Sequence, residues 1–157
     1  MLGEVSRIDI CGQAIEQEKG DKTLMDLLKN DDLGKLILRL TVGILILLHG
    51  IAKIGNPGSL DFIAGQLANN GLPGFIAYGV FVGEIIAPLL LIGGAYCRIA
   101  ALVIVGNMLF SIGLVHMGEL FTLTKNGGWA LELQGFYLFG AVAIAFLGSG
   151  RYAIKRD

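Results

Sequence analysis

Ionisable and amide side chains interrupt stretches of the chain that are otherwise almost wholly apolar. A charged side chain at the centre of a bilayer costs about 2.5–3.5 kcal/mol on insertion scales, so each one needs a physical reason. His49 and Lys53 are four residues apart and therefore share one helix face. Glu84, beside such a pair, could exchange protons or hold a polar ligand. The full set is Arg39, His49, Lys53, Glu84, Asn107, His116, Glu132 and Gln134.

The elements that must position these residues are four apolar stretches. They cover residues 36–54, 73–96, 99–117 and 130–147, and each is close to the ~20 residues that a helix needs to cross a bilayer. Hydrophobic residues make up 54% of the 157 residues, and the mean hydropathy is +0.70. The sequence therefore predicts an all-α membrane protein, a bundle of four transmembrane helices.

The positions of the cations predict the orientation of this bundle. Most Lys and Arg residues precede the first stretch, join the second to the third, or follow the fourth, as the positive-inside rule requires of cytoplasmic segments. We therefore expect both termini in the cytoplasm (N-in/C-in), in a multi-pass protein of the inner (plasma) membrane. The residues that carry this expectation are Lys29, Lys35, Arg39, Arg98, Arg151, Lys155 and Arg156.

Three regions are expected along the chain. Residues 1–33 read as a cytoplasmic N-terminal extension with a short amphipathic segment, because Leu24, Leu27 and Leu28 fall on one helical face. Residues 34–152 form the transmembrane domain, and residues 153–157 form a cytoplasmic tail. No cleavable signal peptide is predicted.

Depth estimates predict that the polar residues share one outward-facing polar cavity. At about 1.5 Å of rise per residue, Glu84 lies roughly 16 Å below the outer boundary and His49 about 8 Å below it. The same reasoning places Asn107 near mid-depth, and His116, Glu132 and Gln134 at the outer mouth. Pro88, just after Glu84, predicts a kink that loosens the backbone ladder there.

Several roles remain open for these side chains. Glu84 is either a proton-exchanging carboxylate or one half of a buried ion pair with Lys53 or Arg39. His49 either works with Glu84 in catalysis or is a histidine hydrogen-bonded to Glu84 or to a nearby backbone group. Arg39 is expected to extend to the headgroups or to pair with a lipid phosphate. His116 either serves the cavity or forms a water-facing pair with Glu119.

Composition also argues against several functions. The formal net charge of −1 gives no electrostatic case for nucleic-acid binding. Cys11 and Cys97 are isolated, so no dithiol relay is predicted. No metal site is predicted, because no two candidate ligands have a diagnostic spacing. The 24 glycines, including the Gly79-x-x-x-Gly83 pair, indicate close helix packing within the bundle or in a homo-oligomer.

A set of motifs resembles one family of small bacterial membrane proteins, the DoxX family. The residues that carry the resemblance are Arg39-Leu40-x-x-Gly43, His49-Gly50-x-x-Lys53, Gly83-Glu84, the run from Gly93 to Ala101, His116, and Gly148-x-Gly150-Arg151. The likeness covers about residues 34–152. It implies a four-helix membrane domain associated with redox complexes, with Arg39, His49, Lys53, Glu84 and His116 as the family's polar signature.

Three functions are compatible with these observations. The first is a quinone-linked oxidoreductase subunit, in which Glu84 and His49 are catalytic and the substrate is bound by Arg39, Lys53, Asn107, His116 and Glu132. Its cofactor would be a quinone that is not tightly bound, and its partners would be membrane lipid and soluble redox proteins. The second is a non-enzymatic scaffold for soluble redox proteins. The third is an oligomeric carrier of small anions or other ligands.

Overall fold

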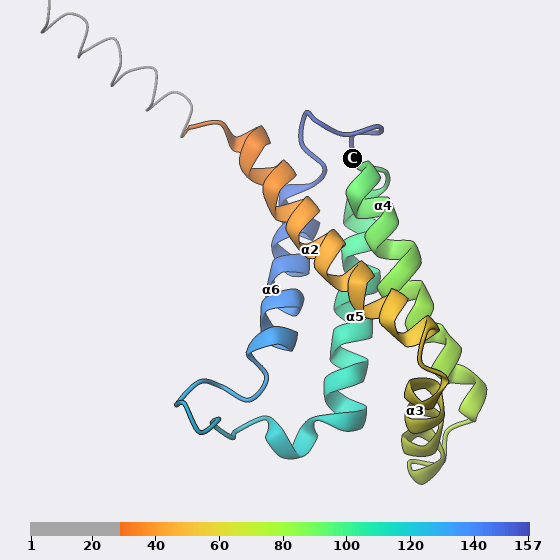
Figure 1. Cartoon of the computed structure of the whole chain (residues 1–157). Helices are drawn as coiled ribbons and strands as arrows, with labels where there is room; N and C mark the ends of the chain where they lie inside the picture. The colour runs from red at the N-terminus through yellow and green to blue at the C-terminus, as the bar shows by residue number, and fades with distance from the viewer. Residues whose placement is uncertain (1–28) are drawn as a thin grey trace, which may run out of the picture. The chain divides into compact units, whose positions relative to one another are not determined.

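The computed structural model describes residues 29–157, in which the regular elements are helices joined by loops and one isolated bridge (Figure 1). The prediction of an all-α protein is confirmed for these residues, and the expected amphipathic segment at Leu24, Leu27 and Leu28 lies outside them. The elements are α2 (Asp31–Ile54), α3 (Pro57–Asn69), the 3₁₀-helix η1 (Gly74–Gly79), the π-helix η2 (Val82–Ile86), α4 (Ala87–Gly93), α5 (Cys97–Val115), the 3₁₀-helix η3 (Met117–Glu119) and α6 (Glu132–Leu147).

Three helical segments are long and apolar enough to cross a membrane. They are α2, the continuous stretch Gly74–Gly93 formed by η1, η2 and α4, and α5. Helix α6 is equally apolar but has only 16 residues. The chain therefore has the helices of a multi-pass membrane protein, while the fourth span and the N-in/C-in orientation stay predictions.

The helix surfaces are those of a protein that meets lipid. Large apolar side chains stand out from the bundle on several helices, with Ile99 62%, Phe139 66% and Phe146 79% exposed. Water-exposed patches of this size are rare in soluble monomers, whereas hydrocarbon accommodates them without cost. The buried core is a narrow seam shared by α2, α4, α5 and α6, which includes Val42, Leu91, Ile104 and Ala141.

Helices α4 and α5 form a tight antiparallel hairpin, as the sequence predicts. The turn lies slightly earlier than expected, at Gly94–Tyr96, where Gly94 (φ 73°) and Tyr96 (φ 51°) are left-handed. The N–H of Ala95 donates to the carbonyl of Leu90 at 3.0 Å, which closes the last turn of α4. Arg98, expected at the break, is instead in the first turn of α5.

The backbone is irregular at Glu84, as Pro88 predicts. Residues Val82–Ile86 form a π-helix, and Pro88 lies in the first turn of α4 directly after it. Because proline cannot donate a backbone hydrogen bond, the ladder before it loosens and takes up an extra residue. Glu84 therefore lies on a segment whose geometry differs from that of a regular helix.

Helix α3 was not predicted, since residues 55–72 read only as a connection between spans. The chain does turn at Gly55–Asn56 and again at Asn70–Pro73, but a 13-residue helix lies between these turns. Pro57 occupies its first turn, and α3 packs against η1 and α5. It therefore stands beside the end of α2 that carries Lys53 (Figure 1).

Candidate functional site

The centre of the candidate site is an ion pair between two helices. Lys53, in the last turn of α2, donates from Nζ to Oε2 of Glu84 in η2 at 2.5 Å. The Glu84 side chain is 7% exposed and that of Lys53 25% exposed. Of the alternatives left open for Glu84, the structure shows the ion pair with Lys53, and Arg39 is not part of it.

A close approach of two backbones fixes this pair. At Gly50, one turn before Lys53, an added Cβ would lie 2.5 Å from the carbonyl oxygen of Glu84. Only glycine allows α2 and η2 to come this near. The predicted packing role of the span glycines is thus confirmed at Gly50, where it positions the two charged side chains.

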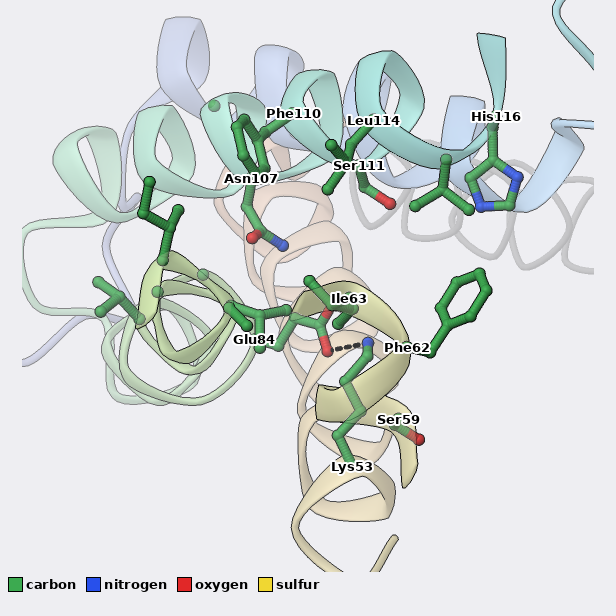
Figure 2. A pocket seen from close by; sticks show the side chains of 18 of the residues that line it. Lys53, Ser59, Phe62, Ile63, Glu84, Asn107, Phe110, Ser111, Leu114 and His116 are labelled. Atoms are coloured by element: carbon green, nitrogen blue, oxygen red, sulfur yellow. Dashed lines mark hydrogen bonds and ion pairs between the residues drawn. The ribbon is translucent and has the colours of Figure 1, made fainter. Parts of the chain in front are cut away.

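A cavity of about 900 Å³ opens from this ion pair between α3, the η1–η2 segment and α5 (Figure 2). Its wall is mainly apolar, in contrast to the polar cavity that the sequence predicts. Lys53, Glu84, Asn107 and His116 supply polar groups at its surface. Its apolar wall includes Phe62, Ile63, Ile76, Val82, Phe110 and Leu114.

Asn107 brings an unused hydrogen-bond donor to this cavity. Its side chain points from α5 toward the segment that carries Glu84 (Figure 2), and at Gly83 an added Cβ would lie 2.5 Å from Asn107 Cβ and Cγ. Its Nδ2 is buried and has no hydrogen-bond partner. Because an unsatisfied buried amide costs about 1–3 kcal/mol, this group is well placed to donate to a bound molecule.

A second, smaller hollow of about 150 Å³ adjoins the first and shares Lys53, Glu84, Ser111 and His116 with it. His49 and Gln134 also line this hollow, so the structure brings together most of the predicted set. The His49 ring packs edge-on against Tyr137 with centroids 5.7 Å apart. Within residues 29–157, the hydrogen bond expected from His49 to Glu84 or to the backbone is absent.

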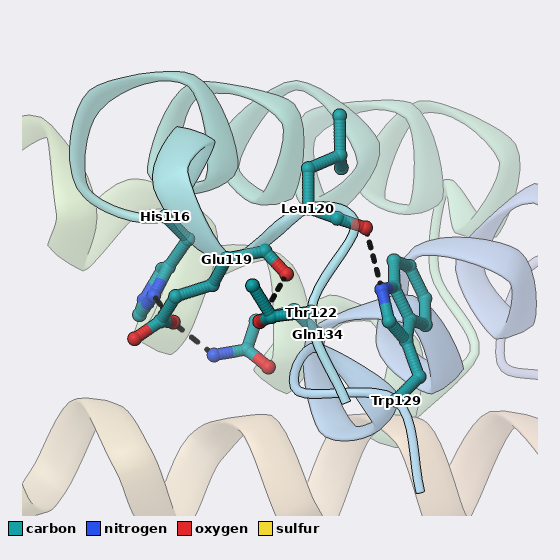
Figure 3. Close-up of polar contacts among 6 residues, drawn as sticks. All are labelled: His116, Glu119, Leu120, Thr122, Trp129 and Gln134. Carbon is teal, nitrogen blue, oxygen red and sulfur yellow. Dashed lines mark hydrogen bonds and ion pairs between the residues drawn. The ribbon is translucent and has the colours of Figure 1, made fainter. Parts of the chain in front are cut away.

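His116 joins the cavities to the loop that follows α5 (Figure 3). Its Nδ1 lies 2.9 Å from Glu119 Oε2, which confirms the predicted pair, and its Nε2 lies 3.5 Å from Gln134 Nε2. Trp129 donates from Nε1 to the carbonyl of Leu120 at 2.8 Å, which links the two ends of this loop. His116 therefore faces both the cavities and an exposed carboxylate.

Two predicted site residues lie elsewhere. Arg39 is about 14 residues before Lys53 on α2, a rise of about 21 Å, and its side chain is buried against the C-terminal segment. It donates to the carbonyls of Ser149 at 2.8 Å and Tyr152 at 2.6 Å, so the prediction that it extends to the headgroups is wrong. The carbonyls that Arg39 binds lie outside any helix, and no sequence pattern marks such carbonyls in advance. Glu132 is exposed and lines neither cavity.

The sequence analysis missed the residues that α3 contributes. Ser59, Phe62 and Ile63 line the larger cavity, although their segment was expected to be a loop. A signal was available, because Pro57 suits a first helical turn and Asn69-Asn70-Gly71 suits a helix end. Among residues 29–157, no three His, Cys, Asp or Glu side chains gather in a way that could hold a metal ion.

Comparison with known proteins agrees with the motifs. The DoxX family pattern matches residues 34–117, just over half of the chain. A protein of Bacillus subtilis (strain 168) named "Putative oxidoreductase CatD" is 33% identical over 124 residues, which is 77% of this chain and 84% of that protein. A Haemophilus influenzae protein named "Uncharacterized protein" is 32% identical over 123 residues, 74% of this chain and 84% of its own length. No solved structure matches significantly. The chain belongs to the DoxX family.

Proposed function

We propose that the chain is the membrane subunit of a redox system and that its larger cavity binds a quinone. The observation that carries this proposal is the contrast inside the cavity. A mainly apolar wall surrounds a paired Lys53 and Glu84 and the unpartnered Nδ2 of Asn107. A quinone has the matching form, a flat apolar ring with two carbonyl oxygens that accept hydrogen bonds.

The side chains can serve both oxygens of such a ring. Lys53 Nζ keeps further N–H bonds beyond the one to Glu84, and Asn107 Nδ2 has none of its protons engaged. Reduction of a quinone to a quinol takes up two electrons and two protons. Both protons would come from water: His116 with Glu119 would take them up at the end of α5, and the Glu84 carboxylate would accept each in turn and pass it to a reduced ring oxygen.

The electrons must come from outside the described chain. We infer that a soluble redox protein or a small reductant supplies them. This donor loses the two electrons that the quinone gains. The name of the B. subtilis relative, an oxidoreductase, supports this class of function. The inner membrane of a bacterium is the location that we propose, with a homo-oligomer as the assembly.

One observation favours the scaffold as a second candidate. The Lys53–Glu84 pair joins α2 to η2, and such an ion pair can have a purely structural role, which is to fix the register of two helices. The anion carrier has less support, because the cation that would attract an anion is already paired with a carboxylate.

Binding of a water-soluble short-chain quinone to the purified protein in detergent tests the proposal. Calorimetry should give saturable heat for the parent chain, and Glu84→Gln and Asn107→Leu should each weaken binding about tenfold, the effect of one lost polar contact. Asp61→Asn is the matched control, an exposed carboxylate of α3 that lines neither cavity. Heat that scales only with micelle concentration, equal in all variants, would favour the scaffold.

A further inference from the structure

We propose a second ligand site, for a phosphate group, in a hollow of about 270 Å³ between the start of α2 and the C-terminal segment. Its ligand would be the phosphate of an anionic phospholipid headgroup. Lys35, Arg151 and Arg156 line this hollow, together with the carboxylates of Asp32 and Asp157. It shares no residue with the quinone site, so this proposal does not depend on that function.

The hollow has a fixed wall, because the C-terminal segment is bound to the bundle along its length. Arg39 holds the carbonyls of Ser149 and Tyr152, as described above. The N–H of Lys155 donates to the carbonyl of Gly94 at 3.0 Å. Lys155 Nζ also donates to Tyr96 Oη at 2.7 Å, which ties the segment to the α4–α5 turn. The backbone that carries Arg151 and Arg156 is therefore held against the bundle.

The two carboxylates of the hollow are already engaged with backbone donors. Asp32 Oδ1 accepts from the N–H of Arg151 at 2.8 Å. Asp157 accepts from the N–H of Arg98 at 2.8 Å and from the N–H of Ser149 at 3.1 Å. Their acceptor oxygens thus hold the backbone in place, and neither forms an ion pair with the cations of the hollow.

Three cations are left without a carboxylate partner. Within residues 29–157, no side chain of Lys35, Arg151 or Arg156 has an anionic oxygen within ion-pair distance. Among the side chains of the hollow, three positive charges face two negative ones whose oxygens are already engaged by backbone N–H groups. Guanidinium groups bind phosphate through paired N–H donors, and a lysine adds a point charge.

The location favours a lipid phosphate over other anions. Leu147, the last residue of the apolar helix α6, lines the hollow, and Lys35 lies near the start of α2. Both positions are at the ends of apolar helices, where headgroups lie. Basic pockets between transmembrane helices bind anionic headgroups in this way, and the cation distribution places the site in the inner leaflet.

Gly150 helps to keep the hollow open. It has a left-handed backbone (φ 72°), and an added Cβ would lie 3.2 Å from Lys35 Cβ. A side chain here would strain the turn and push the stem of Lys35 aside. The glycine therefore lets the C-terminal segment pass close to α2 while Lys35 remains at the wall.

Two neighbouring residues make a matched test. Arg156 lines the hollow, whereas Lys155 points to Tyr96 and does not. Native mass spectrometry of the full chain, titrated with dioleoylphosphatidylglycerol, gives the apparent Kd of the first bound lipid. We expect Arg156→Gln to weaken it about tenfold and Lys155→Gln less than about twofold. Lys35→Gln should resemble Arg156→Gln, and phosphatidylcholine should bind more weakly to the parent chain.

Inorganic phosphate forms the second arm of the experiment. Failure of millimolar phosphate to displace the lipid supports the headgroup as ligand. Displacement that Arg156→Gln weakens and Lys155→Gln does not would keep the anion site but assign it to free phosphate. Equal lipid affinity in Arg156→Gln, Lys35→Gln and Lys155→Gln would overturn the proposal, since binding would then depend on overall charge alone.

Discussion

Replacement of Gly50 by alanine probes the contact on which the candidate site depends. The added Cβ would lie 2.5 Å from Glu84 O, 2.9 Å from Glu84 C and 2.8 Å from Ile85 Cγ1. The Ile85 side chain can rotate away, but a backbone carbonyl cannot. To reach an ordinary contact of 3.4 Å, α2 and η2 must separate by about 0.9 Å.

The expected loss follows from this forced movement. Overpacking of a close contact typically costs about 1–3 kcal/mol, partly offset because alanine suits a helix better than glycine by about 0.5–1 kcal/mol. Gly113→Ala isolates the second effect, because Gly113 is exposed on α5 and has nothing within 4 Å of an added Cβ. Relative to Gly113→Ala, we therefore expect Gly50→Ala to lower the free energy of unfolding by about 1–3 kcal/mol.

Equilibrium unfolding in mixed micelles measures both variants, and quinone titration of the same samples measures the site. Gly50→Ala should also weaken quinone binding, because Glu84 moves with η2 while Lys53 moves with α2. Gly113→Ala should bind as the parent does. If Gly50→Ala is as stable as Gly113→Ala and binds quinone equally well, the close approach at Gly50 does not position the pair and the reasoning is refuted.

Three further predictions concern charged residues. Lys53→Met should lower the free energy of unfolding by about 1–3 kcal/mol, which is less than the loss for a fully buried pair because Lys53 is partly exposed. Lys125→Met, the control, should change it by under about 0.5 kcal/mol. Equal values for the two variants would contradict the pairing. Arg39→Met leaves two carbonyls without their donor, so we expect the free energy of unfolding to fall by about 3 kcal/mol and trypsin to cleave the C-terminal segment faster. Unchanged cleavage would contradict the view that Arg39 holds this segment against the bundle. Burial raises the pKa of Asp157, but hydrogen bonds from two backbone N–H groups, with further help from a nearby hydroxyl and guanidinium, outweigh it and bring the pKa below the ordinary 3.8. A lowered pKa stabilises the fold fully above the unfolded value, and this stability is lost as the pH falls through the lowered pKa. Asp157→Asn should therefore destabilise slightly at pH 7, and its gap from the parent in unfolding measurements should shrink as the pH falls below about 4. A gap that widens in acid would contradict the sign.

The length and apolar composition of the stretches were enough to predict the helical class and three helices that are long and apolar enough to cross a membrane. Pro88 was enough to predict the irregular backbone at Glu84, and the i, i+4 spacing placed His49 and Lys53 on one helix face. These features depend on local chemistry that each segment carries by itself. The ion pair of Glu84 with Lys53 was one of several alternatives that the sequence left open, with Arg39 as another possible partner, and only the structure decides between them.

Other features depend on contacts that no local pattern encodes. Arg39 binds backbone carbonyls of residues 149 and 152, more than 100 positions away, and a carbonyl has no sequence signature. Helix α3 was not predicted because the residues that begin and end it, at Pro57 and at Asn69-Asn70-Gly71, were interpreted as parts of a loop. Part of the apolar lining, Phe62 and Ile63, comes from α3 and could not be anticipated once α3 was missed.

The most direct test of the central claim is photolabelling with an azido-quinone, followed by peptide mapping. The account predicts labels on residues of α3 and α5 that line the larger cavity, Phe62 and Phe110 among them, and excess unlabelled quinone should suppress them. Glu84→Gln should reduce the labelling, and Asp61→Asn should leave it unchanged. Labels spread over the lipid-facing surfaces of α5 and α6, unaffected by excess quinone, would contradict the account.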